Sequence, residues 1–139
     1  MCVEEPLPLP RGYQGKISAD GSHIAYRMNS SWDEERRNYR GGQNRPIWIV
    51  DLKSWDLVSP PWTDSKDMDP VWVGDTVYFI SDRDKNFRYN VYSLDPKTKA
   101  TKQLTHFTEF DIKFPSASGK AIVFENGGYL YKLDVATEK

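Results

Sequence analysis

The sequence has little of what several kinds of functional site need. Its 139 residues contain one cysteine, Cys2, and two histidines. A single cysteine excludes a disulfide within the chain and a cysteine-rich metal site, because both need more than one thiol. Neither His23 nor His106 has a second histidine or a cysteine near it in the sequence, so no zinc site is expected. We therefore expect no metal and no other cofactor.

Two further absences concern large partners. The formal net charge is −1 at pH 7, and acids and bases are mixed along the chain, so a basic surface for nucleic acid or an anionic membrane is not expected. No stretch approaches the roughly 18 consecutive apolar residues of a membrane-spanning helix. The start, MCVEEPLPLPRG, has acids and prolines where a signal peptide needs a basic end and an apolar run. We expect a cytoplasmic location, or a periplasmic one if a signal peptide precedes these residues.

Helical periodicity is also missing over any useful length. Instead, short runs rich in Val, Ile, Tyr, Phe and Trp alternate with clusters of Gly, Asp, Asn and Pro. This alternation is typical of strands separated by turns. At 38% hydrophobic and 14% aromatic residues, one domain of this length can bury a core. The sequence predicts an all-β domain.

Three segments of the chain repeat one pattern. SADGSHIAY, VWVGDTVYF and SASGKAIVF align without gaps on Gly21, Gly74 and Gly119. These glycines are 53 and 45 residues apart (74 − 21 and 119 − 74), about the length of a four-stranded propeller blade. In each repeat a second strand-like run follows and ends in an aspartate: Asp51, Asp95 or Asp134.

The segment from Asp69 to Asn86 shows what one repeat encodes. It reads as the two inner strands of a blade joined at Gly74-Asp75, where a hairpin turn favours a residue that tolerates positive φ. The turn from Asp95 to Lys99 then leads into a more polar outer strand, and Pro96 suits the first corner of a type I turn. We predict a partial β-propeller of about three four-stranded antiparallel blades, at approximately 7–66, 67–111 and 112–139, the last incomplete.

The blade count has a consequence for assembly. Closed propellers typically have about four to eight blades, so we expect this chain to be a segment of a larger ring, or copies of it to assemble. An incomplete ring leaves open β edges with unpaired backbone groups. We expect the isolated chain to associate with itself through these edges.

Two groups of residues are candidates for contact with a peptide or a partner. Asp82 and Arg83 follow a strand expected to be buried and could form a ligand clamp in the channel, or a hydrogen-bond network at the blade edge. The second group lies in a longer first-repeat loop, from Asn29 to Pro46, and insertions of this kind often gather on a binding face. Its members are Trp32, Arg36, Arg37, Tyr39, Arg40 and Arg45.

The loop allows two interpretations. Arginine forms bidentate pairs with carboxylates, so the loop could hold a peptide carboxylate or another domain. Alternatively, it is a solvated insertion whose charges cancel against Asp33, Glu34 and Glu35. The sequence leaves both open.

Catalytic patterns are not found. The sequence has no Gly-x-Ser-x-Gly elbow, no nucleotide loop and no histidine in a triad-like context. The acids Asp64, Asp67 and Asp69 are spaced loosely like a calcium loop, but the required glycine and terminal glutamate do not follow. We expect no catalytic residue and no metal ligand in this chain.

Four phrases of the sequence together resemble a known family. They look like consecutive parts of the amino-terminal six-bladed propeller of tricorn-type proteases, from about Leu7 to the end of the chain. The phrases are YRGGQNRPIWIVDL (Tyr39 to Leu52), DMDPVWVGDTVYFISDRD (Asp67 to Asp84), KQLTHFTEFDIK (Lys102 to Lys113) and GGYLYKLD (Gly127 to Asp134).

The resemblance implies the later half of a propeller in a large, homo-oligomeric serine peptidase that trims oligopeptides. In that family the propellers are thought to gate or guide peptides, while the nucleophile, its base and a PDZ domain lie farther along the chain. The implied partners are peptides and the other domains of the peptidase. The alternatives are a TolB-like interaction module unrelated to proteolysis, a sialidase-like propeller suggested by SADG, and an enzyme acting through residues of this chain.

Overall fold

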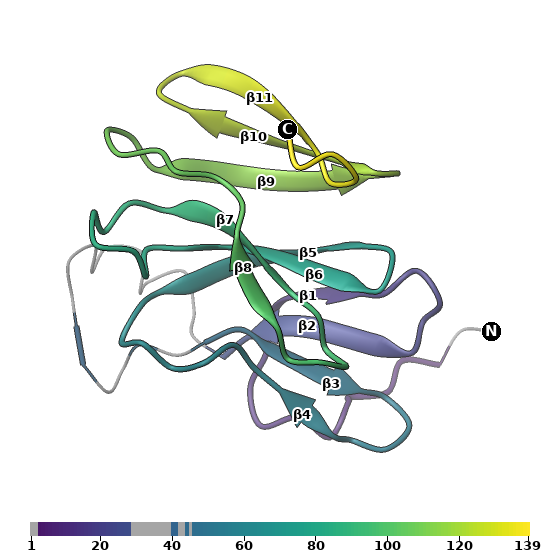
Figure 1. The fold of residues 1–139 in the computed structure, drawn as a ribbon. Helices are drawn as coiled ribbons and strands as arrows, with labels where there is room; N and C mark the ends of the chain where they lie inside the picture. The colour runs from purple at the N-terminus through teal and green to yellow at the C-terminus, as the bar shows by residue number, and fades with distance from the viewer. Residues whose placement is uncertain (1–2, 29–39, 42–43, 45) are drawn as a thin grey trace.

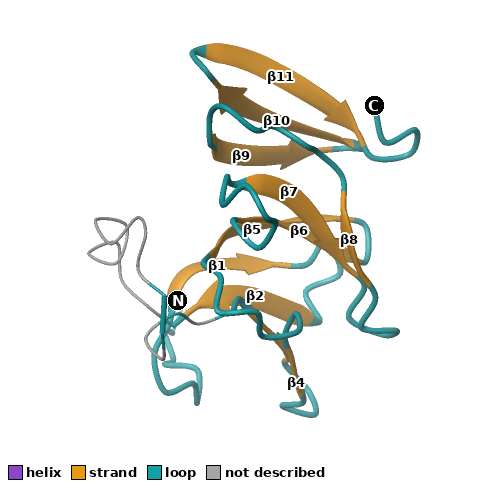
Figure 2. Cartoon of the chain, turned by 60° about the vertical axis from the view of Figure 1, so that its left-hand side comes forward, coloured by secondary structure: helices purple, strands orange, loops and turns teal. Residues whose placement is uncertain are grey.

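The computed structural model describes residues 3–28, 40–41, 44 and 46–139, and within them the secondary structure consists of β-strands (Figures 1 and 2). In this described part of the chain, no helix is long and apolar enough to span a membrane. Eleven strands are formed in the described residues, and all of their pairings are antiparallel.

The strands form three sheets, each built from strands that are neighbours in the sequence. The first contains β1 (Tyr13–Ile17), β2 (His23–Arg27), β3 (Trp48–Asp51) and β4 (Leu57–Val58) in that order. The second contains β5 (Asp67–Val73), β6 (Thr76–Ser81), β7 (Asn90–Leu94) and β8 (Thr101–Gln103). The third contains β9 (Ile112–Ser118), β10 (Ala121–Asn126) and β11 (Tyr129–Asp134).

The sheets stack face to face, and the second lies between the other two (Figure 1). Their first strands are side by side, because β5 contacts both β1 and β9. Such stacking of short antiparallel sheets is the arrangement of propeller blades. The predicted all-β partial propeller is therefore confirmed.

Two hydrophobic clusters hold the stack together, one at each interface between sheets. Strand β6 contributes side chains to both clusters, because neighbouring side chains on a strand point to opposite faces of the sheet. Val77 and Phe79 belong to the cluster shared with the first sheet, whereas Tyr78 and Ile80 belong to the cluster shared with the third. All four are buried, which explains the continuous apolar run in this strand.

The first strand of every sheet contains the same irregularity. Gln14, Asp69 and Phe114 have positive φ values of 53°, 50° and 53°, and the pairing register shifts around each of them. Such a β-bulge bends the strand and raises its twist. Asp69 and Phe114 are 45 residues apart (114 − 69), as are Gly74 and Gly119, so the second and third sheets can be compared position by position.

The turn after the third strand also repeats. Asp51, Asp95 and Asp134 each accept two backbone hydrogen bonds through one carboxylate oxygen, from the residues two and three positions later. These bonds stabilise the charged form and lower the pKa of each aspartate. The aspartates that end the second strand-like run of each repeat are therefore turn-forming residues.

Candidate functional site at the sheet junctions

The loops at one end of the stack form two junctions of similar construction. At each junction, the segment that leads into a sheet meets the residue that follows the second strand of that same sheet. The leading segments are 59–66 and 104–111. Ser81 pairs with Asp67 and Asn126 pairs with Ile112, so the next residues, Asp82 and Gly127, occupy equivalent places.

At the first junction, between the first and second sheets, Asp82 fills this place. Its side chain is fully buried, accepts a hydrogen bond of 2.8 Å from the backbone N–H of Lys66, and forms an ion pair of 2.9 Å with Arg40. The Arg40 guanidinium also lies 4.7 Å from the centre of the Phe87 ring. The first junction thus holds a cation between a carboxylate and an aromatic face.

The connection before β5 also fixes the described part of the first-repeat loop. Asp64 accepts a hydrogen bond of 2.6 Å from the backbone N–H of Gly41. The side chain of Asn44 donates one of 3.2 Å to the backbone oxygen of Asp64. Gly41 and Asn44 are therefore held against the connection before β5.

Arg83 forms a second ion pair close by. Its guanidinium donates to both carboxylate oxygens of Asp67, at 3.0 and 2.9 Å, and lies 5.4 Å from the ring centres of Phe79 and Tyr92. Burial raises the pKa of Asp67, and the charge of Arg83 opposes that shift. Burial also raises the pKa of Tyr92 to about 12.

The predicted contact residues divide into two groups. Asp82, Arg83 and Arg40 are brought together at the first junction, each in an ion pair with another side chain of the protein. Contact of these residues with a ligand stays a prediction. The others lie outside the described residues: Trp32, Arg36, Arg37, Tyr39 and Arg45.

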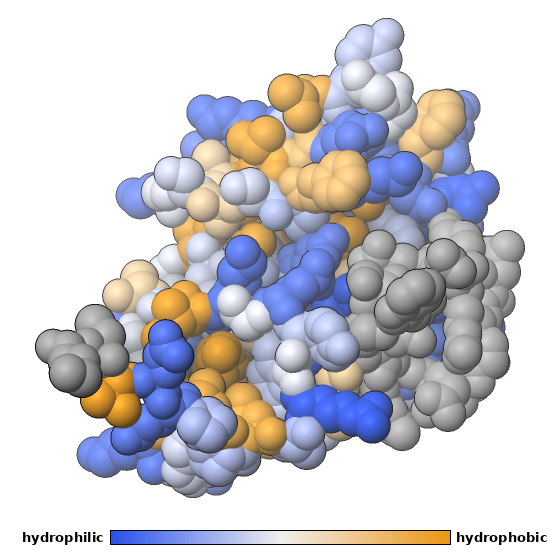
Figure 3. All heavy atoms as spheres, turned by 180° about the vertical axis from the view of Figure 1, so that it is seen from behind, coloured by the Kyte–Doolittle hydropathy of each residue, from blue (hydrophilic) through white to orange (hydrophobic). Residues whose placement is uncertain are grey.

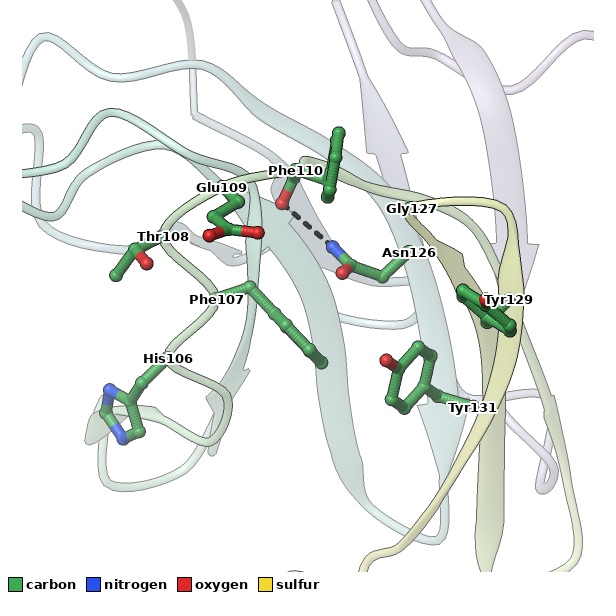
Figure 4. A pocket seen from close by; sticks show the side chains of 9 residues that line it. All are labelled: His106, Phe107, Thr108, Glu109, Phe110, Asn126, Gly127, Tyr129 and Tyr131. Atoms are coloured by element: carbon green, nitrogen blue, oxygen red, sulfur yellow. Dashed lines mark hydrogen bonds between the residues drawn. The ribbon is translucent and has the colours of Figure 1, made fainter.

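At the second junction, between the second and third sheets, a pocket of about 340 Å³ is present (Figure 4). Four aromatic side chains line it: Phe107, Phe110, Tyr129 and Tyr131. Figure 4 shows the rings of Phe107 and Tyr131 turned toward each other, and their centres are 5.2 Å apart in an edge-to-face arrangement. Glu109 lies in the same connection and contributes a carboxylate.

At the edge of this pocket, glycine stands where the first junction has a carboxylate, and the Phe110 ring packs closely against it. Gly127 has a φ of 58°, and a Cβ there would lie 2.9 Å from the Phe110 ring. A side chain at this position would therefore strain the backbone and collide with the ring. Sequence reasoning missed this pocket, although Gly127-Gly128 directly after a strand and the density of aromatics in HFTEF and YLY were visible signals.

Within the described residues, no group of three or more His, Cys, Asp or Glu side chains is placed to hold a metal ion.

Comparison with known proteins identifies relatives. Residues 2–139 match the family described as the tricorn protease N-terminal beta propeller domain. The chain is 33% identical over 98 residues to a tricorn protease homolog of Saccharolobus solfataricus, which covers 70% of this chain. It is 31% identical over 123 residues to the tricorn protease of Thermoplasma acidophilum, which covers 88%. These matches span 9% and 11% of the relatives' lengths.

A similar fold is found in a solved structure of the same group of proteins. A crystal structure of the tricorn protease superposes with a TM-score of 0.67 and 26% sequence identity. The match covers 88% of this chain and 12% of that chain. Sequence and fold thus lead to the same group of proteins.

Proposed function

Because this chain belongs to the family of tricorn protease N-terminal β-propeller domains, we propose that it is a noncatalytic segment of a tricorn-like serine peptidase. In this proposal it gates or guides oligopeptide substrates and provides a scaffold for the peptidase domain. The chain corresponds to about a tenth of the relatives' length, so the activity belongs to the larger protein.

The arrangement of β1, β5 and β9 is the observation that supports this proposal. These strands lie side by side, as the innermost strands of a propeller do around its central channel. A channel of this kind admits an extended peptide and excludes a folded protein by size. Such a filter needs rigid walls rather than reactive groups, and the two buried clusters between the sheets supply that rigidity.

The same proposal covers partners and location. The segment would contact peptides and the other domains of its peptidase, which we propose to be homo-oligomeric and cytoplasmic. Exposed loops at the junctions offer surfaces for domain contacts.

The proposal can be tested by blocking the channel in the full-length protein that carries this segment. Cys2 is replaced by serine, and Gln14, exposed in the innermost strand β1, is replaced by cysteine and labelled with a bulky maleimide. We expect the label to slow hydrolysis of long peptides more than hydrolysis of a fluorogenic tripeptide. The measurement is the ratio of the two rates before and after labelling.

An equally labelled Asp75→Cys variant is the control, because Asp75 is exposed in the turn between β5 and β6. After labelling, the control should show the same ratio of the two hydrolysis rates as before labelling. Complete labelling at position 14 without any change in the ratio, or a full-length protein without peptidase activity, would overturn the proposal.

A further inference from the structure

We propose that the pocket at the second junction binds an alkylammonium group, either a lysine side chain or the amino terminus of a peptide. The choice of a peptide as its carrier rests on the proposed function. The inference that the pocket binds an ammonium group rests on the geometry of the pocket and on a comparison with the first junction.

The first junction shows what chemistry this architecture accommodates. There a cation of the chain, Arg40, is held between the Asp82 carboxylate at 2.9 Å and the Phe87 ring at 4.7 Å. At the second junction, Gly127 stands in the place of Asp82, the Phe110 ring packs against it, and a pocket of about 340 Å³ lies beside these two residues. The chain fills one junction with a cation and leaves the other hollow.

The hollow junction still presents the groups that attract a cation. Glu109 supplies a carboxylate from the connection before β9, and within the described residues no basic side chain forms an ion pair with it. Arg88 donates instead to the backbone oxygen of Glu109, at 3.1 Å. In Figure 4 the ring of His106 points away from the aromatic side chains.

The aromatic side chains provide the remaining attraction. Tyr129 is 73% exposed and Tyr131 39% exposed, so their rings are accessible to a ligand. The faces of aromatic rings carry partial negative charge, and a group of them around an ammonium is a known means of binding it. A carboxylate beside such rings selects a charged group over an apolar one of the same shape.

The pocket is also held in shape before any ligand arrives. Asn126 donates a hydrogen bond of 2.8 Å to the backbone oxygen of Phe110, which Figure 4 shows as a dashed line. Asn90, fully buried, binds both backbone groups of Phe107, at 2.8 and 3.0 Å. The ring of Tyr131 stacks on that of Phe124 at 5.7 Å. Because these contacts fix the lining, little ordering is required on binding.

The test measures the Kd of three pentapeptides for the full-length protein by calorimetry. The first, blocked at both ends, has a central lysine among alanines; the second replaces that lysine by norleucine; the third is the norleucine peptide with a free amino terminus. We expect at least one of the two ammonium-bearing peptides to bind about fivefold tighter than the blocked norleucine peptide. Tighter binding of the lysine peptide identifies a lysine side chain as the source of the ammonium, and tighter binding of the third peptide identifies the amino terminus.

Variants locate the site. Glu109→Gln should remove the preference for the ammonium, and Tyr129→Ala should weaken binding about threefold or more. Asp75→Asn and Tyr13→Ala are matched controls, since both side chains are exposed and lie outside the pocket lining, and they should bind like the wild type.

Equal binding of all three peptides, no binding of any, or wild-type preference in Glu109→Gln would overturn this inference. None of these results decides the proposed function, which the channel-blocking experiment tests separately.

Discussion

Single residues decide what each junction can do. Asp82 and Gly127 occupy equivalent places after β6 and β10, yet one is a buried carboxylate that holds a cation and the other is a glycine at the edge of a pocket. A buried carboxylate requires partners, whereas a glycine adopts positive φ without strain and allows the Phe110 ring to pack against the backbone.

The ion pair of Asp67 with Arg83 should be important for stability. The Asp67 side chain is 1% exposed, so Arg83→Met would leave a buried carboxyl without its cation and lower the free energy of unfolding by about 3–5 kcal/mol. The double variant Asp67→Leu/Arg83→Met should recover most of that loss, because neither charge of this pair remains. Urea unfolding of both variants measures this difference.

The exposed pair of Lys102 and Glu138 provides the comparison. Lys102→Met should change the free energy of unfolding by less than about 1 kcal/mol, since exposed ion pairs contribute little. A loss equally small in Arg83→Met would contradict the assigned importance of the buried pair.

At the scale of elements, the turns after the third strands combine a stabilising residue with a strained one. Each begins with an aspartate that caps the turn, and the residue four positions later has positive φ although it is not glycine. These residues are Trp55, Lys99 and Glu138, with φ values of 64°, 62° and 57°. Side chains other than glycine adopt this region at a cost.

Relief of this strain should stabilise the second sheet. Lys99→Gly should raise the free energy of unfolding by about 0.5–1 kcal/mol, because glycine adopts positive φ without a steric penalty. The matched change Lys97→Gly lies in the same turn but outside the positions of positive φ, and should be neutral or destabilising. Urea unfolding of both variants decides the matter, and an equal effect of the two would show that φ at Lys99 is not the cause.

At the scale of the whole molecule, the third sheet has one face without a neighbouring sheet in the described structure. Large apolar side chains are exposed on this sheet, among them Phe114 at 75% and Leu130 at 80%. The view from behind shows apolar atoms near the top, where this sheet lies (Figure 3). The edge strand β11 also leaves backbone groups available for pairing.

We therefore predict that the isolated chain associates with itself. Light scattering coupled to size exclusion should give a mass above the 16.1 kDa of one chain, increasing with concentration. Leu130→Lys should shift the population toward the monomer, because a charge on an open edge opposes strand pairing. A chain that is monomeric at all concentrations and melts cooperatively would contradict this prediction.

The sequence by itself determined the strands, the turns and their repetition. Gly74-Asp75 specifies a hairpin, and Asp95 begins a capped turn, because both act through hydrogen bonds and backbone angles within a few residues. Consecutive apolar residues such as Val77 and Tyr78 indicate a strand buried on both faces. Repetition of these local signals is sufficient to predict the sheets.

Only the tertiary structure decided which side chains meet at the junctions. Arg40 and Asp82 are 42 residues apart, and their pairing depends on how the first sheet packs against the second. The pocket beside Gly127 likewise depends on two segments that meet only when the third sheet is in place. Local sequence patterns do not predict such long-range contacts. Which residues of two sheets come into contact is set by how the faces of the sheets pack, and not by spacing along the chain.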